Sequence, residues 1–247
     1  MIKLENYEVL GWEHAIRGMR NPMNSWEKSD TCFGDIPCYN CDDRTPGTAH
    51  CDMTKHGGGH RIGPNDHELM MKLASAGPVH GKFRRMITVY VDITAPLYWW
   101  KEFDTYKVGT VANSCSTMHK IHAKEFTMKD FSCEHLMRTE SGWIADNNSH
   151  LWCEPKTLFE TIVKTLNACR DNYLLTKDKK WWWQMIQLLP SSYNQKRTVQ
   201  LNYEVLANMY KSRKNHKLDE WRSLCEWIES LPYSELITTG VKIDVEK

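Results

Sequence analysis

The stretch from His80 to Thr117, HGKFRRMITVYVDITAPLYWWKEFDTYKVGTVANSCST, carries the clearest structural pattern in the chain. Apolar and polar residues alternate over residues 85–93, which predicts a strand with one buried face. The residues on the predicted buried face are Ile87, Val89, Val91 and Ile93. Thr94 as the cap and Pro96 in the first turn then predict a helix that runs to about Tyr106. A loop of small and polar residues follows, so we expect a reactive loop at the end of a rigid support.

Apolar residues at helical spacing predict several further helices. One begins at an Asn65 or Asp66 cap and ends before Gly77. The later helices have these apolar stripes: Leu158, Ile162, Val163 and Leu166; Trp181 to Leu189; Leu201, Val205, Leu206, Met209 and Tyr210; and Leu218, Trp221, Cys225 and Ile228. One clear strand and several helices predict an α+β or mixed α/β fold, formed by a single domain over residues 1–247.

The composition excludes some classes of function. The 247 residues carry a formal net charge of +1, which gives no reason to expect a nucleic-acid or membrane surface. The first residues lack the long apolar run of a signal peptide or a spanning helix. Nine cysteines without such a signal argue against a disulfide framework and for a reducing, cytoplasmic location. The eleven tryptophans are expected to fill a core or a subunit interface.

Two segments, ITAPLYWWKEF with the loop after it and the late QLNYEVLANMYKSR, resemble the flavin-dependent thymidylate synthases. The strand-to-helix junction of that family reads K-A-P-I-[FY], and Thr94 to Tyr98 matches it as TAPLY. The resemblance covers roughly residues 67–125 and 185–230. It implies the mixed α/β fold of that family in a homotetramer with shared active sites. It also implies FAD as cofactor, a pyrimidine deoxynucleotide such as dUMP, and a folate-type carbon donor.

The family signature R-H-R-x-x-S-x-N-x-x-S-x-R is largely replaced in this chain. Thr105, Tyr106 and Lys107 stand at the Arg-His-Arg positions. Without gaps, Thr110 replaces the first Ser, Cys115 the second Ser and Thr117 the closing Arg; a shift of one residue places Asn113 and Ser116 on the family's Asn and second Ser. Thr and Tyr cannot replace the bidentate charge of Arg. The pattern indicates a relative with an altered site.

The resemblance also implies site residues elsewhere in the chain. His80 corresponds to a His at the flavin edge, Asn202 and Asn208 to Asn positions near the flavin ring, Arg213 to an Arg that contacts the nucleotide, and Glu204 to an Arg. Lys107 joins the cofactor-binding candidates, because the Gly109-Thr110 loop beside it offers backbone donors for an anion. The substrate-binding candidates are Thr110, Asn113, Ser116 and Arg213, and the candidate catalytic residue is Cys115.

Less specific interpretations compete with these assignments. If both lie on one helix, Asn202 and Arg213 are about 20° apart, inside an apolar stripe. From the residues alone, a structural hydrogen bond and an Arg that snorkels to solvent are favoured there. Arg84 and Arg85 are expected to form a solvated basic surface. A free Cys such as Cys115 is more often a packed thiol than a nucleophile.

A Cys- and His-rich insertion at about residues 30–62 has no periodic pattern. Its Cys32, Cys38, Cys41 and Cys51 predict a structural zinc site, since Cys38-x2-Cys41 has the usual chelating spacing. His50 or His56 can replace one of the thiolates. The rival interpretation is a flexible loop with unpaired thiols, and both stay open. A zinc deaminase is a weaker hypothesis, because the chain lacks H-x-E followed by P-C-x-x-C.

Three functions follow from these residues. The leading one is flavin-dependent transfer of a one-carbon unit to C5 of a pyrimidine deoxynucleotide, in which the protein mainly positions the partners. The second is a nucleotide- or flavin-binding relative without catalysis, acting as a sensor or inhibitor, with a phage as one candidate source. The third is a divergent enzyme with another pyrimidine reaction, such as hydroxymethylation.

Overall fold

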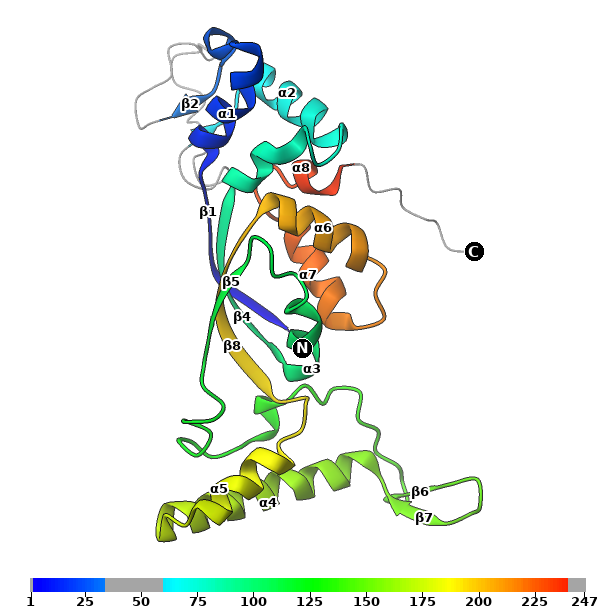
Figure 1. Cartoon of the computed structure of the whole chain (residues 1–247). Helices are drawn as coiled ribbons and strands as arrows, with labels where there is room; N and C mark the ends of the chain where they lie inside the picture. The colour runs from blue at the N-terminus through cyan, green and yellow to red at the C-terminus, as the bar shows by residue number, and fades with distance from the viewer. Residues whose placement is uncertain (1, 34–59, 240–247) are drawn as a thin grey trace, which may run out of the picture. The chain divides into compact units, whose positions relative to one another are not determined.

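The computed structural model describes residues 2–33 and 60–239, and it has the predicted mixture of helices and sheet (Figure 1). A four-stranded sheet has the strand order β1-β4-β8-β5. These strands are β1 (Lys3–Leu10), β4 (Thr88–Pro96), β5 (Val111–Ser114) and β8 (Asn194–Asn202). Two small antiparallel pairs are formed by β2 (Cys32–Phe33) with β3 (His60–Arg61), and by β6 (Trp143–Ala145) with β7 (Leu151–Cys153).

The α-helices account for most of the remaining regular structure. They are α1 (Trp12–Arg20), α2 (Pro64–Ser75), α3 (Leu97–Phe103), α4 (Pro155–Thr176), α5 (Lys179–Leu188), α6 (Tyr203–Arg213), α7 (Asp219–Glu229) and α8 (Glu235–Thr238). Short 3-10 helices are η1 (Asn21–Met23), η2 (Trp26–Lys28), η4 (Gly81–Met86) and η5 (Met128–Asp130). Among the residues that the structure describes, no helix combines the length and apolar character needed to cross a membrane.

The central strand β4 confirms the predicted alternation. Its inward residues are almost fully buried: Ile87 just before the strand, then Val89, Val91 and Ile93. The strand begins later than predicted because residues 81–86 form η4, and it continues to Pro96. The predicted Thr94 cap is therefore wrong. Pro96 is the N-cap of α3, and its extended backbone belongs to the strand.

The sheet contains strands that the sequence patterns did not reveal. Strand β1 buries only Val9 well, and all four residues of β5 are exposed, so neither shows apolar alternation. Strand β8 includes Leu201, which was predicted to lie in a helical stripe but is buried in the sheet. The helix of that segment begins two residues later, at Tyr203. Likewise α2 begins at Pro64 with Gly63 as its N-cap, so the predicted cap at Asn65 or Asp66 is wrong.

The chain divides into two compact units, each made of several segments. The first consists of Met1–Lys3, Thr94–Thr105 and Ser114–Arg197. The second consists of Leu4–Ile93, Tyr106–Asn113 and Thr198–Lys247. Four of the five boundaries fall inside β1, β4, β5 and β8, and the fifth lies between Thr105 and Tyr106, after α3.

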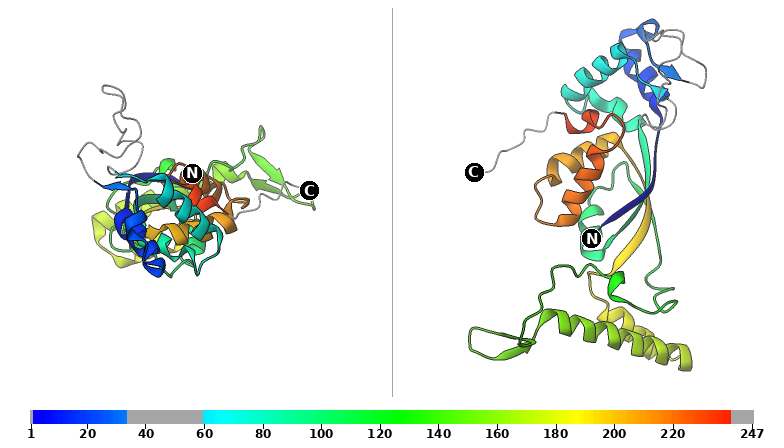
Figure 2. Two further views of the ribbon diagram at one scale, coloured as in Figure 1. Left: turned by 90° about the horizontal axis from the view of Figure 1, so that it is seen from above. Right: turned by 180° about the vertical axis from the view of Figure 1, so that it is seen from behind.

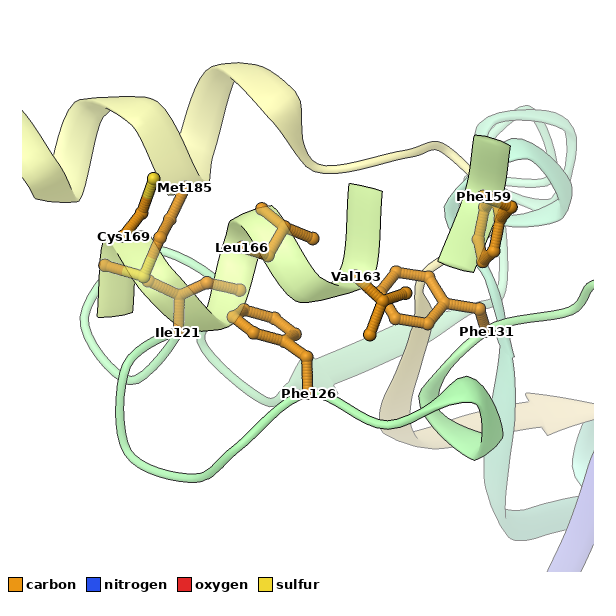
Figure 3. Close-up of a cluster of buried hydrophobic side chains, with 8 residues drawn as sticks. All are labelled: Ile121, Phe126, Phe131, Phe159, Val163, Leu166, Cys169 and Met185. Atoms are coloured by element: carbon orange, nitrogen blue, oxygen red, sulfur yellow. The ribbon is translucent and has the colours of Figure 1, made fainter. Parts of the chain in front are cut away.

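The core of the first unit lies between two helices and a loop. Helices α4 and α5 run side by side, with the β6–β7 pair at the start of α4 (Figure 2). Aromatic residues from the preceding loop pack against them, with Phe131 and Phe159 meeting edge to face at 5.2 Å. Figure 3 shows this cluster, which consists of Ile121, Phe126, Phe131, Phe159, Val163, Leu166, Cys169 and Met185. The helical stripe predicted from Leu158 to Leu166 is thus confirmed, although Leu158 itself is exposed.

The second unit packs α6 against η4, α7 and α8. Trp12 contacts Tyr203 and Tyr233 edge to face, with ring centroids 5.4 and 5.3 Å apart. Trp12 and Trp221 are nearly inaccessible, as are Trp99 and Trp100 in the first unit. The prediction that tryptophans fill the core is confirmed for these four. Trp26, Trp143, Trp152 and Trp183 are exposed instead.

Candidate functional site

The loop Tyr106–Asn113 packs against the beginning of α6 within the second unit. Gly109 has φ +82, a backbone conformation that residues with a Cβ rarely adopt. A Cβ at this position would lie 3.0 Å from both Asn202 Nδ2 and Val205 Cγ2. Thr110 Oγ1 donates a hydrogen bond to the carbonyl of Tyr106. Close approach to α6 therefore requires glycine, and the loop closes on itself around it.

Arg213, in the last turn of α6, is held by two aromatic rings. Its Nε donates to the Tyr106 hydroxyl over 3.0 Å. The guanidinium carbon lies 4.7 Å from the centroid of the Trp221 ring and 5.8 Å from that of Tyr106. Such cation–aromatic contacts favour a fixed guanidinium plane. Arg213 is thus partly buried, with a guanidinium oriented by the Tyr106 and Trp221 rings.

Asn202 lies at the junction of β8 and α6 and caps the helix. Its side-chain oxygen accepts a hydrogen bond from the backbone N–H of Val205 over 3.0 Å. Because Asn202 is extended, it does not share a helical face with Arg213, and the 20° relationship is wrong. The structural hydrogen bond expected from the residues alone is confirmed for Asn202. Asn208, one turn and a half along α6, is exposed.

Glu204 and Arg84 form a buried ion pair beside this junction. Arg84 Nη2 and Nε lie 2.7 and 2.8 Å from Glu204 Oε2, and both side chains are 7% exposed. Arg84 Nη1 also donates to the carbonyl of Leu236 over 3.0 Å. The prediction that Arg84 belongs to a solvated surface is wrong, although Arg85 is exposed. Arg84, which lies in η4, therefore neutralises the negative charge of Glu204, the acidic residue at a family Arg position.

The other predicted ligand residues of the second unit are open to solvent. His80, which precedes η4, is exposed, and so are Lys107 and Asn113 in the loop. Within the described residues, their side chains make no hydrogen bond or ion pair comparable to the cap formed by Asn202. Their parts in cofactor or substrate binding stay predictions.

Cys115 and Ser116 belong to the first unit. The backbone of Cys115 is fixed to β8, because its N–H donates to the Lys196 carbonyl over 2.9 Å and its carbonyl accepts from Gln195 Nε2 over 2.8 Å. The Cys115 side chain is exposed, so it is not a packed thiol. The Ser116 hydroxyl accepts a local bond from the N–H of His119 over 2.9 Å.

Only Cys32 of the proposed zinc ligands lies in the described part of the chain. It is partly buried, in β2, where it pairs with Arg61 of β3. Cys38, Cys41 and Cys51 lie outside the described residues, as do His50 and His56. Within residues 2–33 and 60–239, no group of three or more His, Cys, Asp or Glu side chains could hold a metal ion. The zinc site stays a prediction.

Comparison with solved structures gives matches over nearly the whole chain. Thymidylate Synthase X from Helicobacter pylori, in a structure with FAD and dUMP, matches 95% of this chain and 94% of its own, with a TM-score of 0.57 and 16% identity. A second structure of that enzyme, also with FAD and dUMP, matches 98% and 99%, with a TM-score of 0.59. The chain has the flavin-dependent thymidylate synthase fold. The predicted resemblance is thereby confirmed at the level of the fold.

Another protein with this fold acts on related nucleotides. The UMP/dUMP methylase PolB from Streptomyces cacaoi, bound with 5-Br dUMP, matches 96% of this chain and 94% of its own, with a TM-score of 0.53 and 12% identity. No family model and no curated protein matches the sequence. The fold is therefore retained in a sequence that has diverged far from these structures.

Two features of the site were not found from the sequence. The Arg84–Glu204 pair joins residues 120 positions apart, and its one signal was an acidic residue at a family Arg position. Trp221 was predicted as a core residue of a helical stripe, which is correct, but its second contact, with Arg213, had no sequence signal. Both features depend on side chains that meet only after the second unit has folded.

Proposed function

We propose that this protein is a flavin-dependent enzyme that transfers a one-carbon unit to C5 of a pyrimidine deoxynucleotide, with dUMP as the first substrate to test. The observation that carries the proposal is the match of nearly the entire chain to structures holding FAD and dUMP and to a UMP/dUMP methylase. The carbon donor that we propose is a folate derivative.

We propose FAD as the cofactor, with His80, Lys107, Asn202 and Asn208 as its binding residues. The residues present suit such a group, because Lys107 offers an exposed cation to a diphosphate beside a loop that closes around Gly109. His80 and Asn208 add exposed polar groups in the same unit. When bound, the flavin supplies hydride chemistry that protein side chains lack.

The protein's own contribution is to bind and orient the nucleotide. We propose Arg213 for the phosphate, since its guanidinium is already oriented by Tyr106 and Trp221. Thr110, Asn113 and Ser116 are proposed for the remaining polar groups of the nucleotide, where hydroxyl and amide side chains can donate or accept. Cys115 is an exposed thiol whose backbone is fixed, which suits a group that contacts substrate. Substitution of Cys115 directly tests whether this thiol participates in the reaction.

A second candidate is a relative that binds nucleotide or flavin but does not react. Specific residues favour it: Thr105 and Tyr106 stand where the family has Arg and His, and Glu204 is committed to Arg84. Fewer guanidinium groups mean weaker stabilisation of a phosphate or of charge that develops during reaction. A different pyrimidine reaction, such as hydroxymethylation, is a third possibility within the enzyme class.

One preparation of pure protein separates these functions. Visible flavin absorbance, as purified or after addition of FAD, is expected for either enzyme. Incubation with dUMP, methylenetetrahydrofolate and a reductant should yield a nucleotide whose added mass, read by mass spectrometry, identifies a methyl or a hydroxymethyl group. Bound flavin and nucleotide without any product would favour the sensor or inhibitor. A colourless protein that takes up no FAD would overturn the flavin enzyme altogether.

Further parts of the proposal concern assembly and location. We propose a homotetramer that acts in the cytoplasm, without nucleic-acid or membrane partners, and a structural zinc at Cys32, Cys38, Cys41 and Cys51. Light scattering coupled to size-exclusion chromatography tests the assembly, and a mass of one or two subunits would contradict it. Growth of a thymidine auxotroph that expresses the chain tests whether the product in cells is thymidylate.

A further inference from the structure

Tyr106, Arg213 and Trp221 form one contact group within the second unit. The phenol and indole rings meet edge to face, with centroids 6.0 Å apart and an interplanar angle of 61°. The guanidinium contacts both rings and donates through Nε to the phenol oxygen. The hydrogen bond and the two ring contacts together restrict the position and the plane of the Arg213 guanidinium.

We propose that Tyr106 and Trp221 are positioning residues, which hold Arg213 so that its guanidinium binds the phosphate of the nucleotide. The proposal rests on the proposed function, because it takes a nucleotide as the ligand of that function. Trp221 is fully buried, so it acts on a ligand only through what it holds. Tyr106 is partly buried and lies in the loop that packs on α6.

The geometry explains why such support matters for anion binding. A guanidinium binds phosphate best through two parallel N–H bonds, which requires a fixed plane. A long side chain at a helix end otherwise loses rotamer freedom on binding, which reduces affinity. Fixing Nε on the Tyr106 hydroxyl defines where the two Nη groups point. Arg213 is therefore oriented before any ligand arrives.

A purely structural role makes different predictions from a positioning role. If the group only fastened the loop to α6 and α7, its loss would lower thermal stability and leave anion affinity unchanged. If Tyr106 positions Arg213, loss of the phenol hydroxyl weakens anion binding only while Arg213 is present. A double-mutant cycle distinguishes the two, because it isolates the coupling between the residues.

The experiment uses the full-length, FAD-treated protein and titration calorimetry with dUMP, UMP and inorganic phosphate. The variants are Tyr106→Phe, Arg213→Gln, their combination, and Trp221→Phe, each with a thermal unfolding curve. Arg222→Gln is the matched control, because Arg222 also carries a guanidinium, lies on α7 and pairs with exposed Asp219. It removes the same charge outside the contact group.

We expect Arg213→Gln to weaken dUMP binding by about 10- to 100-fold, as loss of a charge-assisted contact does. Tyr106→Phe should weaken it by about three- to tenfold in the wild-type background and hardly at all when Arg213 is already Gln. Arg222→Gln should stay within about twofold of wild type. Trp221→Phe, if it folds, should act as Tyr106→Phe does.

Two outcomes would overturn the positioning role. One is an equal effect of Tyr106→Phe with and without Arg213; the other is a change in unfolding temperature alone. Failure of the proposed function looks different. If phosphate or UMP binds in a manner that depends on Arg213 and Tyr106 while dUMP is never converted, the positioning role stands and the dUMP reaction is excluded. If wild-type protein binds none of the three anions, the positioning role is excluded as well.

Discussion

Asp30 and Asp66 each bind the other's backbone. The Asp30 carboxylate accepts from the N–H groups of Asn65 and Asp66 over 2.9 and 3.0 Å. The Asp66 carboxylate accepts from the N–H groups of Asp30 and Thr31 over 3.1 and 3.0 Å. Asp30 thus serves the N-terminus of α2 in place of a local cap, and Asp66 holds residues 30–31 against that helix.

The stability of this pair should depend on pH. Burial raises the pKa of Asp66, but hydrogen bonds from Thr31, Ser29 and Arg20, with the charge of Arg20, outweigh it and lower the pKa below its ordinary value. A lowered carboxyl pKa stabilises the fold above the pKa of the unfolded chain, and this stability is lost as pH falls through the folded value. Asp66→Asn should cost about 3–5 kcal/mol near neutral pH, because it leaves the buried Arg20 without its partner.

Urea unfolding at several pH values measures this effect. The difference between wild type and Asp66→Asn should shrink as the pH falls below about 4. Asp219→Asn, which breaks an exposed pair with Arg222, should stay within about 1 kcal/mol of wild type. If the unfolding free energies of Asp66→Asn and wild type differ by the same amount at every pH, the stabilisation does not come from ionised Asp66.

The Arg84–Glu204 pair predicts that a single reversal of charge is harmful. Glu204→Arg, although it supplies the residue type of the related family, places two guanidinium groups in one buried space and should unfold the protein or cost more than about 3 kcal/mol. Glu204→Gln should cost less, because the amide oxygen can still accept from Arg84. Chemical denaturation checks both variants. Equal stability of Glu204→Arg and wild type would show that the pair contributes nothing.

Substitution of Asn202 separates its capping role from a role in flavin binding. Asn202→Ala removes the bond to the Val205 N–H and should cost about 1 kcal/mol. Asn202→Asp keeps an acceptor at the cap and should retain stability. If Asn202 also contacts FAD, Asn202→Asp should bind FAD more weakly despite its normal stability. Flavin fluorescence titration measures this, and unchanged FAD affinity in both variants would remove Asn202 from the cofactor site.

The cysteines should differ strongly in reactivity. Burial raises the pKa of Cys225 to about 12, with a further contribution from Glu229, so this thiol stays protonated and protected. Burial also raises the pKa of Cys169. Cys115 is exposed, and brief alkylation followed by peptide mass spectrometry should label it well before Cys169 or Cys225. Labelling of Cys225 as fast as Cys115 in folded protein would contradict the packing of α7.

Metal analysis of pure protein addresses the Cys-rich insertion. We expect about one zinc per chain in wild type and loss of that zinc in Cys38→Ser and Cys41→Ser, with lower thermal stability. Cys115→Ser is the control, because Cys115 lies in a different unit from Cys32. Wild-type protein prepared without chelator and free of zinc would end the hypothesis.

The sequence predicted those elements whose burial leaves a periodic trace. Strand β4 was predicted because one face is buried along its length, and α4 and α7 because each has an apolar stripe. Strand β8 was missed because polar residues such as Lys196 and Arg197 are partly covered within it. Strand β1 was missed because it buries so little. The two edge strands, β1 and β5, expose nearly all of their residues and therefore carry weak signals.

The sequence predicted which residues belong to the candidate site, but not which side chains pair with one another. Lys107, Thr110 and Arg213 do lie in one unit, with the loop against α6. The burial of Arg84 was not predicted, because the sequence does not show that Arg84 pairs with Glu204. Asn202 was predicted to have a structural hydrogen bond, which is correct, but on the wrong element. Single residues were thus easier to select than the bonds they make.

The division of each unit among distant segments has a consequence for synthesis on the ribosome. Three contacts of the early segment form only after residue 198 has been made. They join Trp12 to Tyr203, Ile62 to Tyr233, and Arg84 to Glu204. During synthesis, the early segment Leu4–Ile93 of the second unit therefore leaves apolar surface uncovered while more than half of the chain has not yet been made. Such non-local closure slows folding and invites association of incomplete chains. We expect nascent chains of this protein to depend on chaperones until α6 emerges.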